Sequence, residues 1–162
     1  MYAVKIFQKM RENLRLVYLL LLMLGAASAR DTIIMDALHS KAAAYYSQGD
    51  YSNAIIVYED LLAEKELAFG NQDIHVAETL TQLGEMYALT GMPDIAEYYF
   101  QQAIIIFQES FESGKNALEV PLLNLLKIYI FQNDTLMTQT IKHQLHSIAA
   151  IFQTPNSIYP DF

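Results

Sequence analysis

Apolar residues recur along most of the chain at intervals of three and four, which is the period of one face of an α-helix. The clearest case runs from Leu80 through Leu83 to Tyr87. Glycine, asparagine, aspartate or proline breaks the pattern between such segments. The pattern predicts six helices, at residues 31–48, 51–68, 74–90, 93–111, 117–131 and 134–152, and therefore an all-α fold.

The helical pattern returns with a fixed period. Tyr45, Tyr87 and Tyr129 lie 42 residues apart, and each closes the apolar face of a predicted helix. Two further sets of positions keep the same spacing: Leu38, Leu80 and Leu122, and Gly49, Gly91 and Asn133. A period shared by separate positions indicates three copies of one helix pair, because each copy is a unit that stacks on the next.

The repeated positions each have a structural reason. Glycine and asparagine tolerate the left-handed backbone that ends a helix, so Gly49, Gly91 and Asn133 are predicted to terminate the first helix of each pair. Ala54 and Ala96 are small residues where the two helices of a pair are expected to cross. The sequence therefore predicts helical hairpins.

The second repeat resembles a known family. Leu83-Gly84-x-x-Tyr87 with a following Ala96-x-x-x-Phe100 is similar to the tetratricopeptide signature, and the 42-residue period is similar to the kinesin-light-chain variety, whose repeats exceed the usual ~34 residues. The resemblance covers about residues 35–148. It implies a right-handed superhelical α-solenoid of about three antiparallel helix pairs, which binds a peptide or protein in its concave groove and has no catalytic role.

The third repeat departs from the pattern. Thr138 stands where alanine is expected and Lys142 where an aromatic residue is expected. Terminal repeats are commonly atypical because a neighbour covers only one of their faces. The first helix of this repeat is apolar on nearly every side, so we expect another element to cover Leu123, Ile130 and Phe131. The candidates are the tail, with Ile158, Tyr159 and Phe162, and a partner protein.

The first helix of each repeat has a second face. Each residue turns about 100° around a helix, so Ser40, Gln82 and Asn124, two places after each leading leucine, point away from the core of the pair. The resemblance implies that this face lines the concave groove, where asparagines grip a peptide backbone. The alternative is a solvated polar face. The predicted groove residues are Asp36, His39, Ser40, Glu78, Thr81, Gln82, Glu85, Leu123, Asn124 and Lys127.

The N-terminal residues have the plan of a secretory signal. Four basic residues precede an apolar run from Leu16 to Leu24, and Ala27 and Ala29 follow in the A-x-A arrangement. The apolar stretch to Ala29 has 14 residues, fewer than the roughly 20 of a membrane-spanning helix. We expect a signal peptide at 1–29, a repeat domain at 30–152 and a tail at 153–162, with the mature chain periplasmic or secreted. The alternative is an uncleaved membrane anchor.

Charge narrows the class of partner. The formal net charge is −8, and removing residues 1–29 takes four of ten basic and one of 18 acidic residues, which leaves −11. Nucleic acid is therefore a poor partner, because phosphate binding needs clustered Lys and Arg. The acidic run of Glu59, Asp60, Glu64 and Glu66 is expected to be a solvated helix face.

Candidate chemistry is sparse. The chain has no cysteine, and it lacks the motifs of hydrolases, phosphate loops and metalloproteases. His143 and His146 lie three apart but without a third ligand nearby in sequence, so we expect neither a metal nor a cofactor. A protein-binding scaffold is the favoured class, and a structural subunit that binds its own copies is the alternative.

Overall fold

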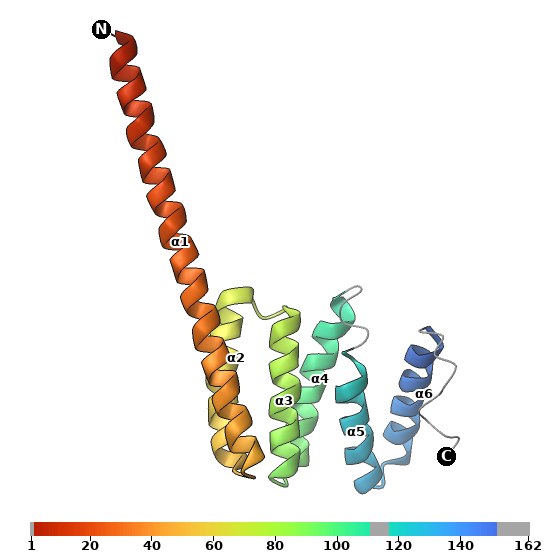
Figure 1. The fold of residues 1–162 in the computed structure, drawn as a ribbon. Coiled ribbons are helices and arrows are strands. Elements are labelled where there is room, and N and C mark those ends of the chain that lie inside the picture. Colours follow the sequence, from red (N-terminus) through yellow and green to blue (C-terminus); the bar gives the residue numbers. More distant parts are fainter. Residues whose placement is uncertain (1, 111–116, 152–162) are drawn as a thin grey trace. The chain divides into compact units, whose positions relative to one another are not determined.

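In a computed structural model, the backbone is described for residues 2–110 and 117–151, and side chains for 13–19, 30–110 and 117–150. These residues form helices and no strand, as predicted (Figure 1). The helices are α1 (Tyr2–Ser47), α2 (Tyr51–Phe69), α3 (Ile74–Leu89), α4 (Pro93–Glu109), α5 (Glu119–Phe131) and α6 (Thr135–Ile151). The predicted boundaries of α2 to α6 hold to within two residues.

The start of α1 differs from the prediction. The helix begins at Tyr2 rather than at residue 31 and continues through Ala27 and Ala29 to Ser47. Residues 2–47 contain no proline and a single glycine, and they are rich in Leu, Ala, Lys and Arg, which favour helix. The chain divides into two compact units, Met1–Ala37 and Leu38–Phe162, with the division inside α1. Among the residues described with side chains, no helix is both long and apolar enough to cross a membrane.

The second unit is a row of helices in sequence order. Each helix from α2 to α6 packs against the next one, and α3 also contacts α5 (Figure 1). One apolar core runs continuously from α3 to α6. The helical-repeat fold is therefore confirmed.

The predicted helix ends are confirmed at all three repeats. Gly49, Gly91 and Asn133 have positive φ angles of 73°, 78° and 59°. The next N–H in each case donates to a carbonyl five residues back, the Schellman bond that satisfies the end of a helix. The three bonds are Asp50 to Tyr45 at 3.0 Å, Met92 to Tyr87 at 2.9 Å and Asp134 to Tyr129 at 2.9 Å.

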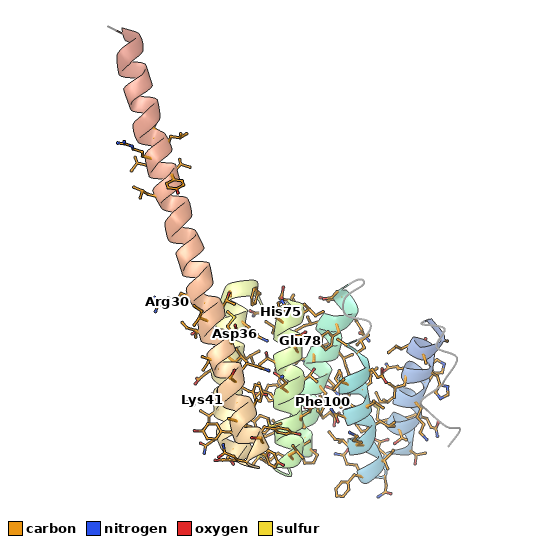
Figure 2. The ribbon with its side chains drawn as sticks, viewed as in Figure 1. Arg30, Asp36, Lys41, His75, Glu78 and Phe100 are labelled. Carbon is orange, nitrogen blue, oxygen red and sulfur yellow. The ribbon has the colours of Figure 1, made fainter. Side chains whose placement is uncertain are left out.

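The predicted crossing points are also confirmed in the first two pairs. Ala54 and Ala96 are fully buried. Gly84 faces Phe100 so closely that a Cβ atom added at Gly84 would lie 2.7 Å from the Phe100 ring. Phe100, labelled in Figure 2, is itself fully buried. Small residues on one helix thus make room for the aromatic ring of the other.

Candidate functional site

Thr81 does not belong to an accessible groove. Its side chain is buried, and its hydroxyl donates to the Ala77 carbonyl at 2.9 Å. A threonine hydroxyl in a helix commonly bonds to the carbonyl four residues back, which satisfies the hydroxyl and allows the residue to be buried. Thr81 is next to Gln82 in the sequence and is therefore predicted to lie on the same helix face. The packing of α3 against its neighbouring helices buries Thr81, so it is not accessible to a partner.

Gln82, the central residue of the predicted α3 face, is half-buried. Its Oε1 atom is buried and has no hydrogen-bond partner within the part of the chain described. A buried acceptor without a donor costs free energy. The Gln82 Oε1 acceptor is therefore not used by the described part of the chain.

Three further polar residues of the predicted groove, on α3 and α5, form a chain of hydrogen bonds. The Asn124 Nδ2 atom donates to Glu85 Oε1 at 3.1 Å, and the Lys127 Nζ atom donates to Asn124 Oδ1 at 3.0 Å. Glu85, Asn124 and Lys127 thus lie together, as the sequence predicted. Each end of the Asn124 carboxamide therefore makes one hydrogen bond within the molecule. The role that the resemblance implied for an asparagine on this face, gripping a peptide backbone, stays a prediction.

On α1, His39 and Ser40 are exposed, as the prediction requires. The His39 ring lies 6.2 Å from the ring of Tyr58 on α2, in an edge-on contact. This contact turns His39 towards its own repeat. Asp36 is exposed as well but belongs to the other compact unit, Met1–Ala37.

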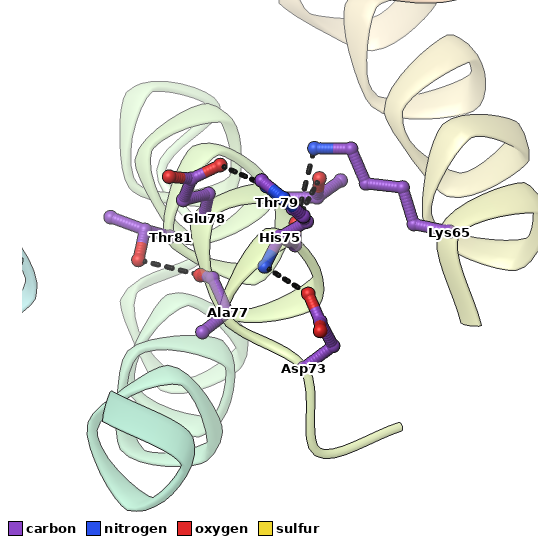
Figure 3. A network of polar contacts seen from close by, with 7 residues as sticks. All are labelled: Lys65, Asp73, His75, Ala77, Glu78, Thr79 and Thr81. Carbon is purple, nitrogen blue, oxygen red and sulfur yellow. Dashed lines mark hydrogen bonds and ion pairs between the residues drawn. The ribbon is translucent and has the colours of Figure 1, made fainter. Parts of the chain in front are cut away.

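A polar network fixes the beginning of α3 (Figure 3). Asp73 caps the helix by accepting from the His75 N–H at 2.9 Å, and Lys65 Nζ donates to the His75 carbonyl at 3.1 Å. The His75 ring and Glu78 lie 3.4 Å apart. Burial lowers the pKa of Lys65, and the nearby Glu78 opposes that effect. Glu78 therefore presents a carboxylate at the N-terminal end of α3, held by His75.

Exposed apolar side chains lie at the C-terminal ends of α1, α3 and α5. Tyr46, Leu89, Ile130 and Phe131 are all exposed, Phe131 to 82%. They lie seven residues after His39, Gln82, Leu123 and Asn124 respectively, so they continue the faces on which the predicted groove residues lie. The sequence analysis did not assign them to the groove, although the same spacing of seven could have found them.

The predicted need for cover over the third repeat is met in part. Leu123 is half-buried and packs against the core, whereas Ile130 and Phe131 stay exposed among the described residues. The tail with Ile158, Tyr159 and Phe162, the predicted cap, lies outside the described residues.

Two tyrosine bonds join successive repeats. The Tyr87 hydroxyl donates to Glu59 on α2 at 2.9 Å, and the Tyr129 hydroxyl donates to Glu97 on α4 at 2.7 Å. Burial, with the adjacent carboxylate as a further cause, raises the pKa of each tyrosine to about 12. These bonds fix α3 and α5 against the preceding helices and so hold the groove residues in register.

His143 and His146 are both exposed on α6. Within the described side chains, no group of three or more His, Asp and Glu residues could hold a metal ion.

Stacked helix pairs that present one face of their first helices define a class, the helical-repeat scaffold. Residues 33–109 match the tetratricopeptide repeat family, and these residues are tetratricopeptide repeats, as their spacing indicated. Tetratricopeptide scaffolds typically mediate protein–protein interaction and are generally non-catalytic.

A solved structure shares this fold. BtubC (BKLC) from P. vanneervenii is similar with a TM-score of 0.68 and 20% sequence identity, over 79% of this chain and 52% of that one. The chain thus spans about half the length of this relative. No curated protein sequence matches the chain.

Proposed function

We propose that the face formed by α1, α3 and α5 binds a peptide or a segment of a partner protein, without catalysing a reaction. The observation that carries the proposal is the set of exposed apolar side chains Tyr46, Leu89, Ile130 and Phe131. They come from three different repeats and lie on the same helix faces as the polar groove residues. Exposed apolar side chains on one face of a folded protein are typical of an interaction site.

The polar part of this face supports a binding role in a different way. Hydrogen bonds join Asn124 to Glu85 and Lys127 to Asn124, so these three side chains are held in fixed positions on this face. A partner then gains apolar contacts at the ends of the helices, where Tyr46, Leu89 and Phe131 are exposed. Binding to a pre-organised surface loses less entropy than binding that must order its own contacts.

Capture from the native cell tests the groove. We expect the chain to retain a specific partner, and Leu89→Asp with Phe131→Asp to lose it, because charges replace apolar contacts. Leu67→Asp is the control, since Leu67 is exposed at 86%, close to the 82% of Phe131, but lies on α2. Retention of the partner by the groove variant, or its loss in the control as well, would contradict the proposal.

We also propose that the chain is exported and that residues 1–29 are removed. The basic residues before Leu16 and the Ala27-x-Ala29 site support this reading. Leu14, Leu16 and Tyr18 are exposed, as expected for a segment recognised by an apolar binding site. Intact-mass measurement of exported material should give a chain that begins at Arg30. A mass that includes residues 1–29 would mean an anchor.

A further inference from the structure

A second set of exposed apolar side chains lies on α2 and α4, away from the predicted groove. Ile56 on α2 and Ile95, Tyr98 and Ile105 on α4 are between 42% and 58% exposed. Ile95, Tyr98 and Ile105 follow the spacing of three and seven that marks one face of a helix. Ile56 and Tyr98 are 42 residues apart, so they occupy equivalent positions of successive repeats. These four residues define the α2–α4 face.

Ring contacts and one hydrogen bond lead from Tyr98 on α4 through α3 to α2. The Tyr98 ring lies 5.6 Å from the Tyr99 ring, which stacks at 5.3 Å on Tyr87. Tyr87 in turn donates to Glu59 on α2. The Glu59 carboxylate also contributes to the raised pKa of Tyr99, after burial as the larger cause. Tyr87 lies on α3, so these contacts form a chain from α4 through α3 to α2.

The charges on these two helices have one sign. Their sequences contain seven carboxylates: Glu59, Asp60, Glu64, Glu66, Asp94, Glu97 and Glu109. Lys65 is the only Lys or Arg in either helix, and its ammonium group donates to the His75 carbonyl. The two helices that carry the α2–α4 face are thus strongly acidic, and of their carboxylates Glu59 and Glu97 already accept hydrogen bonds from tyrosines.

We propose that the α2–α4 face docks a basic amphipathic helix of a partner protein, at a site separate from the groove. Apolar residues of such a helix would cover Ile56, Tyr98 and Ile105, and its Lys and Arg side chains would face the carboxylates. A second copy of the chain fits this face poorly, because the net charge of −8 would bring like charges together. The proposal does not depend on occupancy of the groove.

A synthetic helical peptide of leucine and lysine, with leucines spaced three, four and seven apart, tests the chemistry. The matched peptide carries glutamate in place of lysine. We expect the lysine peptide to bind the full chain about tenfold or more tightly than the glutamate peptide in fluorescence anisotropy, with affinity falling as salt rises.

Variants locate the binding site. Tyr98→Ser with Ile105→Ser should weaken binding of the lysine peptide about tenfold, whereas the groove variant Leu89→Ser with Phe131→Ser should change it less than about twofold. Asp60→Asn with Asp94→Asn retains the shape of the surface and should also weaken binding. Circular dichroism checks that each variant is folded.

Three results would overturn the proposal. The first is equal binding of the lysine and glutamate peptides. The second is an equal loss in the groove variant, which would place the peptide in the groove. The third is a dimer in light scattering that Tyr98→Ser with Ile105→Ser converts to monomer, which would make a second copy the occupant.

Discussion

The second and third helix pairs have the same register but different contents at their crossing. In the second pair, Gly84 makes room for Phe100. The equivalent residues of the third pair, 42 positions later, are Leu126 and Lys142. Leu126 is half-buried and packs against the core, and Lys142 is half-buried. The large side chain has therefore moved from the second helix of the pair to the first.

In this chain, the residue that fills the crossing can thus come from either helix of a pair. Protein interiors are packed to crystal-like density, so a missing ring must be replaced from another direction. The third pair matches the family pattern weakly, because Lys142 stands where an aromatic residue is expected. Its helices α5 and α6 still pack into the common core through Leu122, Ile141 and Leu145.

The largest effect is expected from a charge at the crossing. Ala96→Glu should lower the free energy of unfolding by about 3–5 kcal/mol, because Ala96 is fully buried and the carboxylate would have no partner. Thr138→Glu is the matched change in the third pair, where the residue is half-buried, and should cost about 1 kcal/mol or less. Urea denaturation measures both, and equal losses would mean that the two crossings are packed alike.

A smaller effect is expected from filling the space at Gly84. Gly84→Ala would place its Cβ 2.7 Å from Phe100, and overpacking of about 1–3 kcal/mol is offset in part by the better helix propensity of alanine, near 1 kcal/mol. Adding Phe100→Leu should recover part of the loss, which a double-mutant cycle detects. In the third pair, Leu126→Ala should destabilise through lost volume instead. A fully additive cycle would contradict the proposed competition between Gly84 and Phe100.

The hydrogen bonds of Tyr87 and Tyr129 allow the two junctions between successive repeats to be compared directly. Tyr129 is 3% exposed and Tyr87 is half-buried, so Tyr129→Phe should cost about 1–2 kcal/mol and Tyr87→Phe less. Glu97→Ala is not a neutral surface change, because it removes the acceptor of the buried Tyr129 hydroxyl. Equal urea midpoints for the two Phe variants would show that burial does not strengthen the bond.

The same bonds give a pH dependence. The folded-state pKa of both tyrosines is raised from 10.0 to about 12, so their contribution to stability is fully present below pH 10. It is lost as the pH rises towards 12, because the unfolded chain then releases the phenolic protons first. Urea midpoints measured across this interval should fall more steeply for the native chain than for the double Tyr→Phe variant. Parallel curves would contradict the assignment.

Effects of opposite sign are expected at two helix ends, and the gain at Asn133 is the smallest effect of all. Gly91 has a φ of 78°, so Gly91→Ala should cost about 1–2 kcal/mol. Asn133 has a φ of 59°, and Asn133→Gly should instead gain a few tenths of a kcal/mol, because glycine adopts this conformation without a Cβ penalty. Thermal melts compare the two variants. A loss in Asn133→Gly would mean that the asparagine side chain itself stabilises the cap.

The sequence alone located the helices from α2 to α6, their period and their ends. These features depend on short-range physics, because helix periodicity, the left-handed cap and the small crossing residue are each determined within a few neighbouring positions. The predicted start of α1 at residue 31 followed from the expected removal of residues 1–29. In the full chain the helix begins at Tyr2, because nothing in residues 2–30 stops it.

Only the tertiary structure decided which predicted groove residues stay exposed and which are buried or hydrogen-bonded within the chain. Glu59 and Glu97 accept from tyrosines 28 and 32 residues away, at positions that are not equivalent within the repeat. Asn124 donates a hydrogen bond to Glu85, which is 39 residues away in the sequence, and Thr81 is buried by neighbouring helices. The repeat fixes where each helix lies, but whether a side chain on it stays free depends on which residue the neighbouring helix presents. That depends on contacts between distant positions, which no local pattern encodes.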